Sequence, residues 1–235
     1  MRLFLMSQSN IYIDIGNSAV KWRTPKSNVY SKNIDEFLLT SLPQAETAWV
    51  SAVANLHIVD DLETHFDRVH LVSSQKKFNN LKISYDDSSS LGSDRFFAML
   101  GASTLYPKNP LLVIDIGSAM TFDVIDGDGI HQGGLIMPGL GALRTSFSKF
   151  ETTDVSTSID ALASNTTDAW KSGTQAMLIS SINDQIVKFN DMFSDGIVTI
   201  CGGLVSEIKN ELPKPVQIFD NLVLDGLECY SQTVG

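Results

Sequence analysis

The chain has 235 residues, 43% of them hydrophobic and 19% charged, so it can bury a sizeable core and is not a disordered polymer. Its 27 acidic and 17 basic residues give a net charge of −10, and no local cluster of Lys and Arg offsets it, which argues against nucleic-acid binding but leaves nucleotides open. Two cysteines without CxxC spacing disfavour a disulfide framework. The apolar runs, including the one at residues 1–6, are too short for a signal peptide or a membrane contact. We therefore expect a cytoplasmic protein.

An internal repeat is the strongest feature along the chain. Residues 11–22 recur as residues 112–122, each an apolar strand that runs into Asp-Ile-Gly, then small hydroxyl residues and a second strand. The two aspartates, Asp14 and Asp115, lie almost half a chain length apart, as a duplicated domain predicts. Two prolines at 107 and 110 interrupt regular structure between the copies. We therefore expect an N-terminal domain over 1–107 and a C-terminal domain over 108–235.

The remaining segments alternate between strand and helix, which is typical of α/β domains. In chain order we expect strands at 48–53 and 69–73, a helix at 93–105, strands at 120–125 and 134–137, helices at 139–150 and 168–193, a strand at 197–201 and a helix at 203–212. The long helix has apolar residues at intervals of three and four, which predicts a buried stripe. These residues are Leu178, Ile182, Ile186, Phe189 and Phe193.

The repeated Asp-Ile-Gly turns have the composition of a phosphate site. A carboxylate at the tip of a buried strand is costly unless it has a partner, and the glycine lets backbone N–H groups approach a ligand. Asn17, Ser18 and Lys21 add donors in the first copy, as Ser118 and Thr121 do in the second. Two such turns facing a cleft would bracket a triphosphate, with Mg²⁺ held through water. The alternative is two ordinary hairpin turns with Asx hydrogen bonds, but duplication over ten positions favours the phosphate site.

A second motif, Gly92-Ser-Asp-Arg95, opens the helix expected at 93–105. Taken alone it is typical of a helix N-cap with an exposed ion pair. It also suits phosphoryl transfer to an alcohol, because Asp94 could accept the hydroxyl proton and Arg95 could bind a carboxylate through two hydrogen bonds. Both interpretations are compatible. No GxxxxGK[ST] sequence is present, and the histidines lack metal-binding spacing.

These motifs resemble those of the acetate and sugar kinase, Hsp70 and actin superfamily, and within it the type III pantothenate kinases over nearly the full chain. The matching segments, in the family's order, are 14–21, Tyr85 with 92–95, 115–121, 133–139, 165–166 with 172–173, and 202–203. The resemblance implies duplicated ribonuclease H-like (actin-like ATPase) domains with a cleft between them.

The resemblance also implies roles for individual residues. The ATP phosphates and their metal would be bound by the first turn, namely Asp14, Ile15, Gly16, Asn17, Ser18, Ala19, Val20 and Lys21. Further ATP contacts would come from Ser118, Gly202 and Gly203. The pantothenate pocket would be lined by Tyr85, Gly92, Ser93, Asp94, Arg95 and Thr166, with Asp94 as proton acceptor. Asp14 would hold Mg²⁺ through water, and Asp115 would bind a monovalent cation, K⁺ or NH₄⁺.

The implied activity is ATP-dependent phosphorylation of pantothenate to 4'-phosphopantothenate, the first step of coenzyme A biosynthesis, in a homodimer. Two alternatives stay open: a non-catalytic relative that acts as an accessory factor in transcription, and another small-molecule kinase of the superfamily. The sequence departs from the family at several positions. Cys201 stands where Thr commonly precedes the paired glycines, and Trp170-Lys171 replaces the common Met-Gln.

Overall fold

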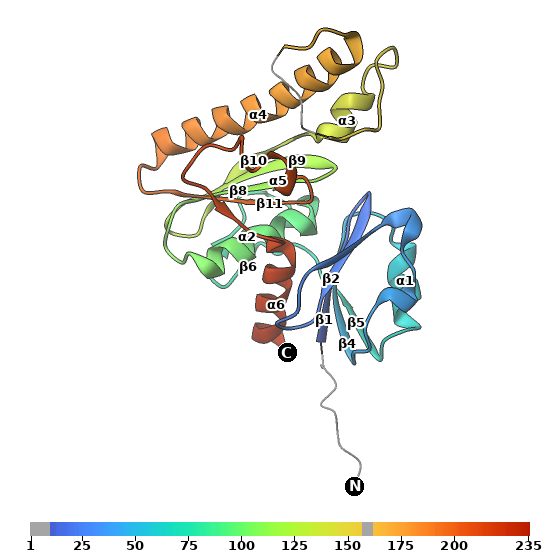
Figure 1. Ribbon diagram of the computed structural model, residues 1–235. Coiled ribbons are helices and arrows are strands. Elements are labelled where there is room, and N and C mark those ends of the chain that lie inside the picture. The colour runs from blue at the N-terminus through green and yellow to red at the C-terminus, as the bar shows by residue number, and fades with distance from the viewer. Residues whose placement is uncertain (1–9, 157–161) are drawn as a thin grey trace. The chain divides into compact units, whose positions relative to one another are not determined.

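The computed structural model describes residues 10–156 and 162–235, which form two compact α/β units (Figure 1). Unit 1 contains the described residues up to Pro107 together with Asn221–Gly235, and unit 2 is Lys108–Asp220. Along these described ranges, no helix is both long and apolar enough to cross a membrane. The apolar run at residues 1–6 lies outside them.

Unit 1 is built on a five-stranded sheet of order β3-β2-β1-β4-β5. Its strands are β1 (Asn10–Ile15), β2 (Ala19–Arg23), β3 (Tyr30–Asn33), β4 (Thr47–Ala52) and β5 (Arg68–Leu71). A small hairpin pairs β6 (Lys77–Phe78) with β7 (Leu81–Lys82). The helices are α1 (His57–Glu63), α2 (Ser93–Leu105) and α6 (Leu222–Val234), with short 3-10 turns at Ile34–Glu36, Leu39–Ser41 and Ser88–Ser90.

Helices cover both faces of this sheet, α1 on one side and α6 with α2 on the other (Figure 1). Because successive side chains of a strand point to opposite faces, alternate residues of β1 have different neighbours. The isoleucines of β1 pack with α1 in one apolar cluster. Tyr12 faces the other way, and its hydroxyl lies 3.2 Å from that of Ser231 on α6. Asp14 shares the face of Tyr12, so its carboxylate is on the side of α2 and α6.

The last helix corrects the predicted division of the chain, because Asn221–Gly235 belong to unit 1 and not to the second domain. Helices α2 and α6 approach so closely that glycine is needed at their crossing. A Cβ on Gly101 would lie 2.4 Å from the Leu222 carbonyl oxygen, and one on Gly226 would lie 2.0 Å from that of Phe97. Arg23 on β2 adds ion pairs to Asp225 (2.8 Å) and Glu228 (2.6 Å). These contacts fix α6 to unit 1.

Unit 2 repeats the same topology with the sheet order β10-β9-β8-β11-β12. Its strands are β8 (Leu111–Ile116), β9 (Ala119–Ile125), β10 (His131–Pro138), β11 (Ile197–Cys201) and β12 (Gln217–Ile218), and its helices are α3 (Leu140–Thr145), α4 (Thr166–Met192) and α5 (Val205–Ile208). In each sheet the first strand pairs antiparallel with the second and parallel with the fourth. The predicted duplication is thereby confirmed.

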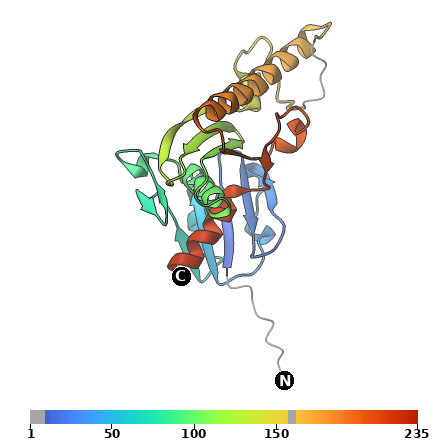
Figure 2. The same ribbon diagram turned by 90° about the vertical axis from the view of Figure 1, so that its left-hand side faces the viewer.

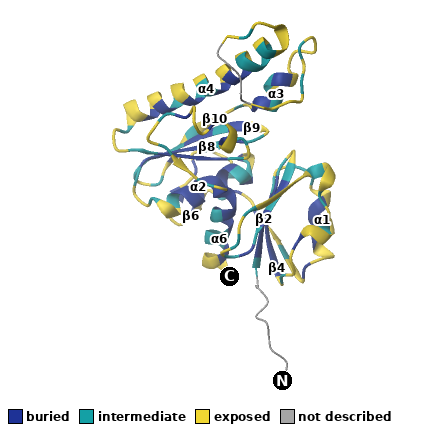
Figure 3. Cartoon of the chain, viewed as in Figure 1, coloured by how far each residue is buried: buried dark blue, intermediate teal, exposed yellow. Residues whose placement is uncertain are grey.

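The long helix α4 lies along the sheet of unit 2 (Figure 2). Its predicted stripe is confirmed: Leu178, Ile182, Ile186 and Phe189 are buried in the core of unit 2, and Phe193 packs against it. The opposite side of α4 is exposed, as Figure 3 shows by its yellow residues.

Two helices are shorter than the sequence predicts. The helix expected over 139–150 ends at Thr145, because Phe147 and Phe150 turn back to pack around Trp170 with ring centroids 6.3 and 5.7 Å away. The helix expected over 203–212 is regular only over Val205–Ile208 and continues as a turn, in which the Glu211 N–H donates to the Ile208 carbonyl oxygen.

Candidate functional site

The first hairpin joins β1 to β2 in unit 1. In the sheet register Asp14 lies between Lys21 on β2 and Ser51 on β4, and it is only 7% exposed. The Gly16 N–H donates to the Ala19 carbonyl oxygen at 3.0 Å and closes the turn, while Asn17 and Ser18 are exposed at its tip. A nearly buried carboxylate therefore lies beneath a turn that is open to a ligand.

Asn55 supports this turn, and the sequence does not predict this contact. It follows β4 with a left-handed backbone (φ 53°), which asparagine tolerates better than most residues. Its side-chain Nδ2 donates to the Gly16 carbonyl oxygen at 2.9 Å. The available signal was an asparagine three residues after a strand, which is typical of a turn but does not reveal its distant partner.

The predicted substrate motif lies in the same unit. Gly92 is the N-cap of α2, and Asp94 lies in the first turn of a helix whose predicted bounds, 93–105, are confirmed. The buried Ser93 hydroxyl lies 2.9 Å from that of Ser51, the residue beside Asp14 in the sheet. This hydrogen bond ties the start of α2 to the strand next to the Asp14 hairpin. Ser51 was not singled out from the sequence, since a serine within a strand has no distinctive pattern.

Arg95 and Tyr85 form the remainder of this cluster. The Arg95 Nη1 donates to the Tyr85 hydroxyl at 3.1 Å, and the guanidinium carbon lies 5.8 Å from the centre of the Tyr85 ring. Arg95 is 6% exposed, so its position is set by packing as well as by this contact. The Asp94 Oδ1 accepts from the Arg95 backbone N–H at 2.7 Å, and it would lie 2.5 Å from a Cβ on Gly92. Glycine at 92 therefore leaves room for the Asp94 carboxylate.

The second hairpin joins β8 to β9 in unit 2 and is one residue shorter. Asp115 pairs with Thr121, where the first hairpin has Asp14 opposite Lys21. The Gly117 N–H donates to the Ala119 carbonyl oxygen at 3.0 Å. Gly139, at the end of β10, holds this turn by donating its N–H to the Ser118 carbonyl oxygen at 3.1 Å. A Cβ on Gly139 would lie 2.2 Å from the Gly117 carbonyl oxygen, so only glycine fits there.

The paired glycines follow β11, beside the same hairpin. Gly202 has φ +117°, and a Cβ there would lie 2.4 Å from the Ile116 carbonyl oxygen. Gly203 has open space instead: apart from its chain neighbours, no atom of the described residues lies within 4 Å of the place that a Cβ would take. The first glycine packs against the strand and the second leaves backbone open to a ligand. Cys201 is buried, as expected for a structural thiol.

The predicted site residues thus fall into separate groups. Unit 1 brings together the Asp14–Lys21 hairpin, Tyr85 and the segment 92–95. Unit 2 brings together Asp115, Ser118 and the paired glycines. Thr166 also belongs to unit 2. It is exposed at the start of α4, where the Asn165 side chain caps the helix by accepting from the Asp168 N–H at 3.0 Å.

The side chains of this site suit a metal ion that is coordinated partly by the protein and partly by a bound ligand. Within 10–156 and 162–235 no three His, Cys, Asp or Glu side chains cluster to hold an ion by themselves. Mg²⁺ in nucleotide sites is bound by one or two carboxylates together with substrate phosphates and water. A single carboxylate below each turn, Asp14 or Asp115, fits that kind of coordination.

Comparison with solved structures agrees with this fold. A protein of Campylobacter jejuni described as a conserved putative Baf family transcriptional activator has a TM-score of 0.62 at 21% identity, covering 95% of this chain and 98% of that one. MreB 5 of Spiroplasma citri, bound to AMPPNP, has a TM-score of 0.51 at 12% identity, with 96% of each chain covered. The chain has the duplicated ribonuclease H-like fold of actin-like ATPases and the kinases related to them.

Sequence comparison then gives the family. The family model described as type III pantothenate kinase matches residues 10–188. A type III pantothenate kinase of Colwellia psychrerythraea is 30% identical over 94% of this chain and 99% of its own length. One from Chromobacterium violaceum is 29% identical over 92% and 97% of the two lengths. The chain belongs to the type III pantothenate kinase family.

Proposed function

We propose that this protein transfers the γ-phosphoryl group of ATP to the hydroxyl group of pantothenate, the first step of coenzyme A biosynthesis. The observation that carries the proposal is the Ser51–Ser93 hydrogen bond of 2.9 Å. It holds the start of α2, with Asp94, next to the strand that pairs with the Asp14 hairpin. This contact supports the proposal, because phosphoryl transfer to an alcohol requires a carboxylate near the hydroxyl group and close to the groups that bind the phosphates.

The two hairpins divide the work of binding ATP in this proposal. In unit 1 the segment Asp14–Lys21 binds phosphate oxygens through the backbone N–H groups of the exposed turn and through the Lys21 ammonium group. In unit 2 Ser118, Gly202 and Gly203 contact the nucleotide, since the turn is exposed and Gly203 leaves its backbone accessible. Asp14 holds Mg²⁺ through water. When bound, the metal neutralises the charge that develops on the phosphate oxygens.

The substrate residues accept a proton and bind pantothenate. Asp94 accepts the proton of the attacking hydroxyl, and as a base it gives the oxygen more nucleophilic character. Arg95, oriented by the Tyr85 hydroxyl, binds the carboxylate or amide of pantothenate, for which a planar guanidinium is better suited than an ammonium group. Thr166 supplies a further contact from α4.

The proposal also includes a monovalent cation beside Asp115 and a homodimeric state. Asp115 lies below the second turn, where a carboxylate beside a triphosphate is unfavourable unless a cation sits near both. We assign K⁺ or NH₄⁺ to that position. The enzyme acts as a homodimer in the cytoplasm.

The test is ATP-dependent phosphorylation of pantothenate by the purified protein, in K⁺ and in Na⁺ buffers, beside a panel of other alcohols, sugars and acids. We expect a product with pantothenate and stimulation by K⁺ that is blunted in Asp115→Asn. Phosphorylation of another substrate in the panel, but not of pantothenate, would contradict the substrate. Equal rates in both buffers for wild type and variant would contradict the K⁺ site.

A further inference from the structure

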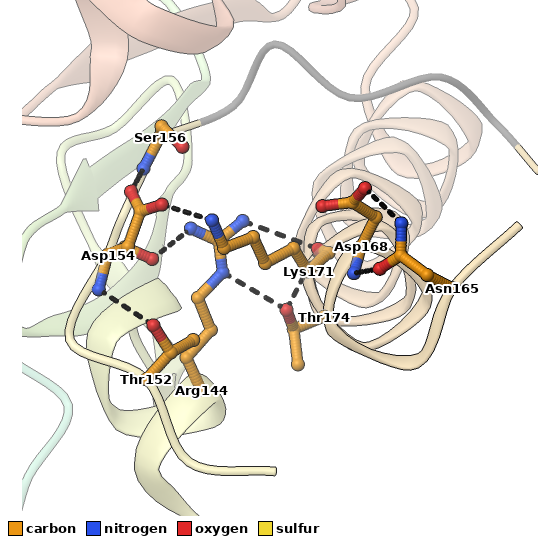
Figure 4. A network of polar contacts seen from close by, with 8 residues as sticks. All are labelled: Arg144, Thr152, Asp154, Ser156, Asn165, Asp168, Lys171 and Thr174. Atoms are coloured by element: carbon orange, nitrogen blue, oxygen red, sulfur yellow. Dashed lines mark hydrogen bonds and ion pairs between the residues drawn. The ribbon is translucent and has the colours of Figure 1, made fainter. Parts of the chain in front are cut away.

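A buried arginine in unit 2 joins three segments that are distant in sequence (Figure 4). Arg144, in the last turn of α3, is fully buried. Its Nε donates to the Thr174 hydroxyl (3.3 Å), its Nη1 to the Asp154 carbonyl oxygen (2.5 Å) and its Nη2 to the Lys171 carbonyl oxygen (3.3 Å). Burial lowers the pKa of the guanidinium, and the nearby Asp154 carboxylate opposes that shift. The three hydrogen bonds offset the cost of burying this charge and join α3 to Asp154 and to α4.

Two side chains of α4 also contact the other two segments. The Trp170 Nε1 on α4 donates back to the Arg144 carbonyl oxygen at 3.0 Å. The Lys171 ammonium group forms an ion pair with the Asp154 carboxylate, which also accepts from the Ser156 N–H at 2.8 Å. We call Arg144, Asp154, Lys171 and Thr174 the Arg144 clamp. It connects α3, residues 152–156 and the first turns of α4.

The clamp lies between two parts of the candidate site. On one side, α3 begins directly after Gly139, whose N–H donates to the Ser118 carbonyl oxygen in the second hairpin. On the other side, Lys171 and Thr174 are one and two turns beyond Thr166, the first residue of α4. Because α3 has only 6 residues, Arg144 lies little more than one helical turn beyond Gly139. The clamp therefore fixes the start of α4 relative to the hairpin that contains Ser118.

We propose that Arg144, Asp154 and Lys171 are positioning residues for the pantothenate site: they hold the start of α4, and Thr166 with it, at a defined place relative to the Ser118 hairpin. The inference rests on the proposed function, in which Thr166 contacts pantothenate. None of the three needs to touch either substrate. Loosening the clamp should therefore weaken pantothenate binding and leave ATP binding and the chemical step unchanged.

Lys171→Met tests this, because it keeps the apolar stem of the side chain and removes the ion pair to Asp154. Lys188→Met is the matched control, since Lys188 is on the same helix and pairs at 2.7 Å with Asp184, one turn away on α4 itself. We expect the KM for pantothenate to rise about five-fold in Lys171→Met, the size of effect that one partly exposed ion pair supports. The KM for ATP and kcat should stay within about two-fold, Lys171→Arg should restore the KM, and Lys188→Met should match wild type.

Asp154→Asn and the double variant with Lys171→Met complete the design. If the two residues act as one contact, the double variant should be no worse than either single variant. Unchanged pantothenate KM in Lys171→Met, or an equal change in Lys188→Met, would overturn the clamp while the kinase proposal stands. If the wild type does not phosphorylate pantothenate, the proposed function fails by itself. Amide hydrogen exchange in the first turns of α4 then decides the clamp: faster exchange in Lys171→Met alone supports it, and equal exchange in all variants rejects it.

Discussion

The two hairpins pair in the same way with the parallel strand beside them, but they differ in length and in part of their support. Below each turn an aspartate pairs with a parallel strand, Asp14 with Ser51 and Asp115 with Cys201. Both turns have two backbone hydrogen bonds from neighbouring segments. In the first, the Ile34 and Val53 N–H groups donate to the Ser18 and Ile15 carbonyl oxygens (3.0 and 3.2 Å), and in the second, the Gly139 and Leu204 N–H groups donate to those of Ser118 and Ile116 (3.1 and 3.3 Å). The first turn has in addition a side-chain hydrogen bond, from the Asn55 Nδ2. The second turn has in addition the close packing of Gly139 against Gly117 and of Gly202 against Ile116.

Their neighbours differ as well. Ser51 is hydrogen-bonded to Ser93 at the start of α2, which places Asp94 near the first hairpin, whereas Cys201 is a buried thiol followed by two glycines. A duplicated fold thus supplies two equivalent turns, and the residues around them differ: the Ser51–Ser93 hydrogen bond joins the first to α2, and glycines allow close backbone contact at the second. The comparison predicts that polar substitutions should affect catalysis through unit 1 and glycine substitutions should affect binding through unit 2.

The largest effect is expected from Asp94→Asn. Asparagine is nearly isosteric and can occupy a helix start, so the fold should persist, but it cannot accept the proton. Loss of a general base typically lowers the rate by about 10²–10⁴. We expect that fall in kcat with pantothenate and unchanged ATP affinity. The control is Asp60→Asn, an exposed acidic residue in the first turn of α1. A near-normal kcat would remove Asp94 from the mechanism, and lost ATP affinity would assign it to the nucleotide site.

A smaller effect is expected from Gly202→Ala, compared with Gly203→Ala. At 202 the methyl group would meet the Ile116 backbone at φ +117°, and strain of this kind costs about 1–3 kcal/mol. At 203 the methyl group has space. Thermal unfolding should therefore show a lower Tm for Gly202→Ala and a wild-type Tm for Gly203→Ala. Equal Tm values for the two variants would contradict the distinct roles assigned to the glycines.

Asn55 allows the side-chain support of the first turn to be isolated. Asn55→Gly keeps the left-handed backbone and removes the hydrogen bond to Gly16, a loss of about 0.5–1.5 kcal/mol. Asn55→Ala adds the strain of that backbone conformation. We expect ATP affinity, measured by calorimetry, to fall several-fold in Asn55→Gly, and stability to fall further in Asn55→Ala. If Asn55→Gly binds ATP like wild type, the first turn does not depend on this side chain.

The smallest expected effect is on the pH dependence of stability, to which the sheet of unit 1 contributes a tyrosine that the sheet of unit 2 lacks. Burial raises the pKa of the Tyr12 hydroxyl, whereas Val113 occupies the corresponding place in unit 2. The Tyr12 pKa is thus higher in the folded state than in the unfolded chain, where it is about 10. The contribution of Tyr12 to the free energy of unfolding is therefore fully present below the unfolded-state pKa and is lost as pH rises through the folded-state pKa. Urea midpoints between about pH 8 and 11 should fall less steeply in Tyr12→Phe than in wild type. Tyr30→Phe, an exposed tyrosine on β3, is the control. Parallel curves for Tyr12→Phe and wild type would contradict this contribution.

The sequence by itself determined the features that repeat or have a local period. The two Asp-Ile-Gly turns, the helix at 93–105 and the buried stripe of α4 could be predicted because each depends on neighbours within a few residues. Roles for Asp14, Asp94 and Asp115 could also be predicted, since their motifs resemble a family. Those roles remain predictions for the experiments above.

Only the tertiary structure decided which distant residues support these features. Four contacts join parts of the chain that local sequence does not relate. They are Ser51 with Ser93, Asn55 with Gly16, α6 with α2, and Arg144 with the three segments around it. Serine, asparagine and arginine have many possible environments, and no pattern within a few residues selects one of them. Packing selects it, because a buried donor must find an acceptor and a close helix crossing needs glycine on both sides.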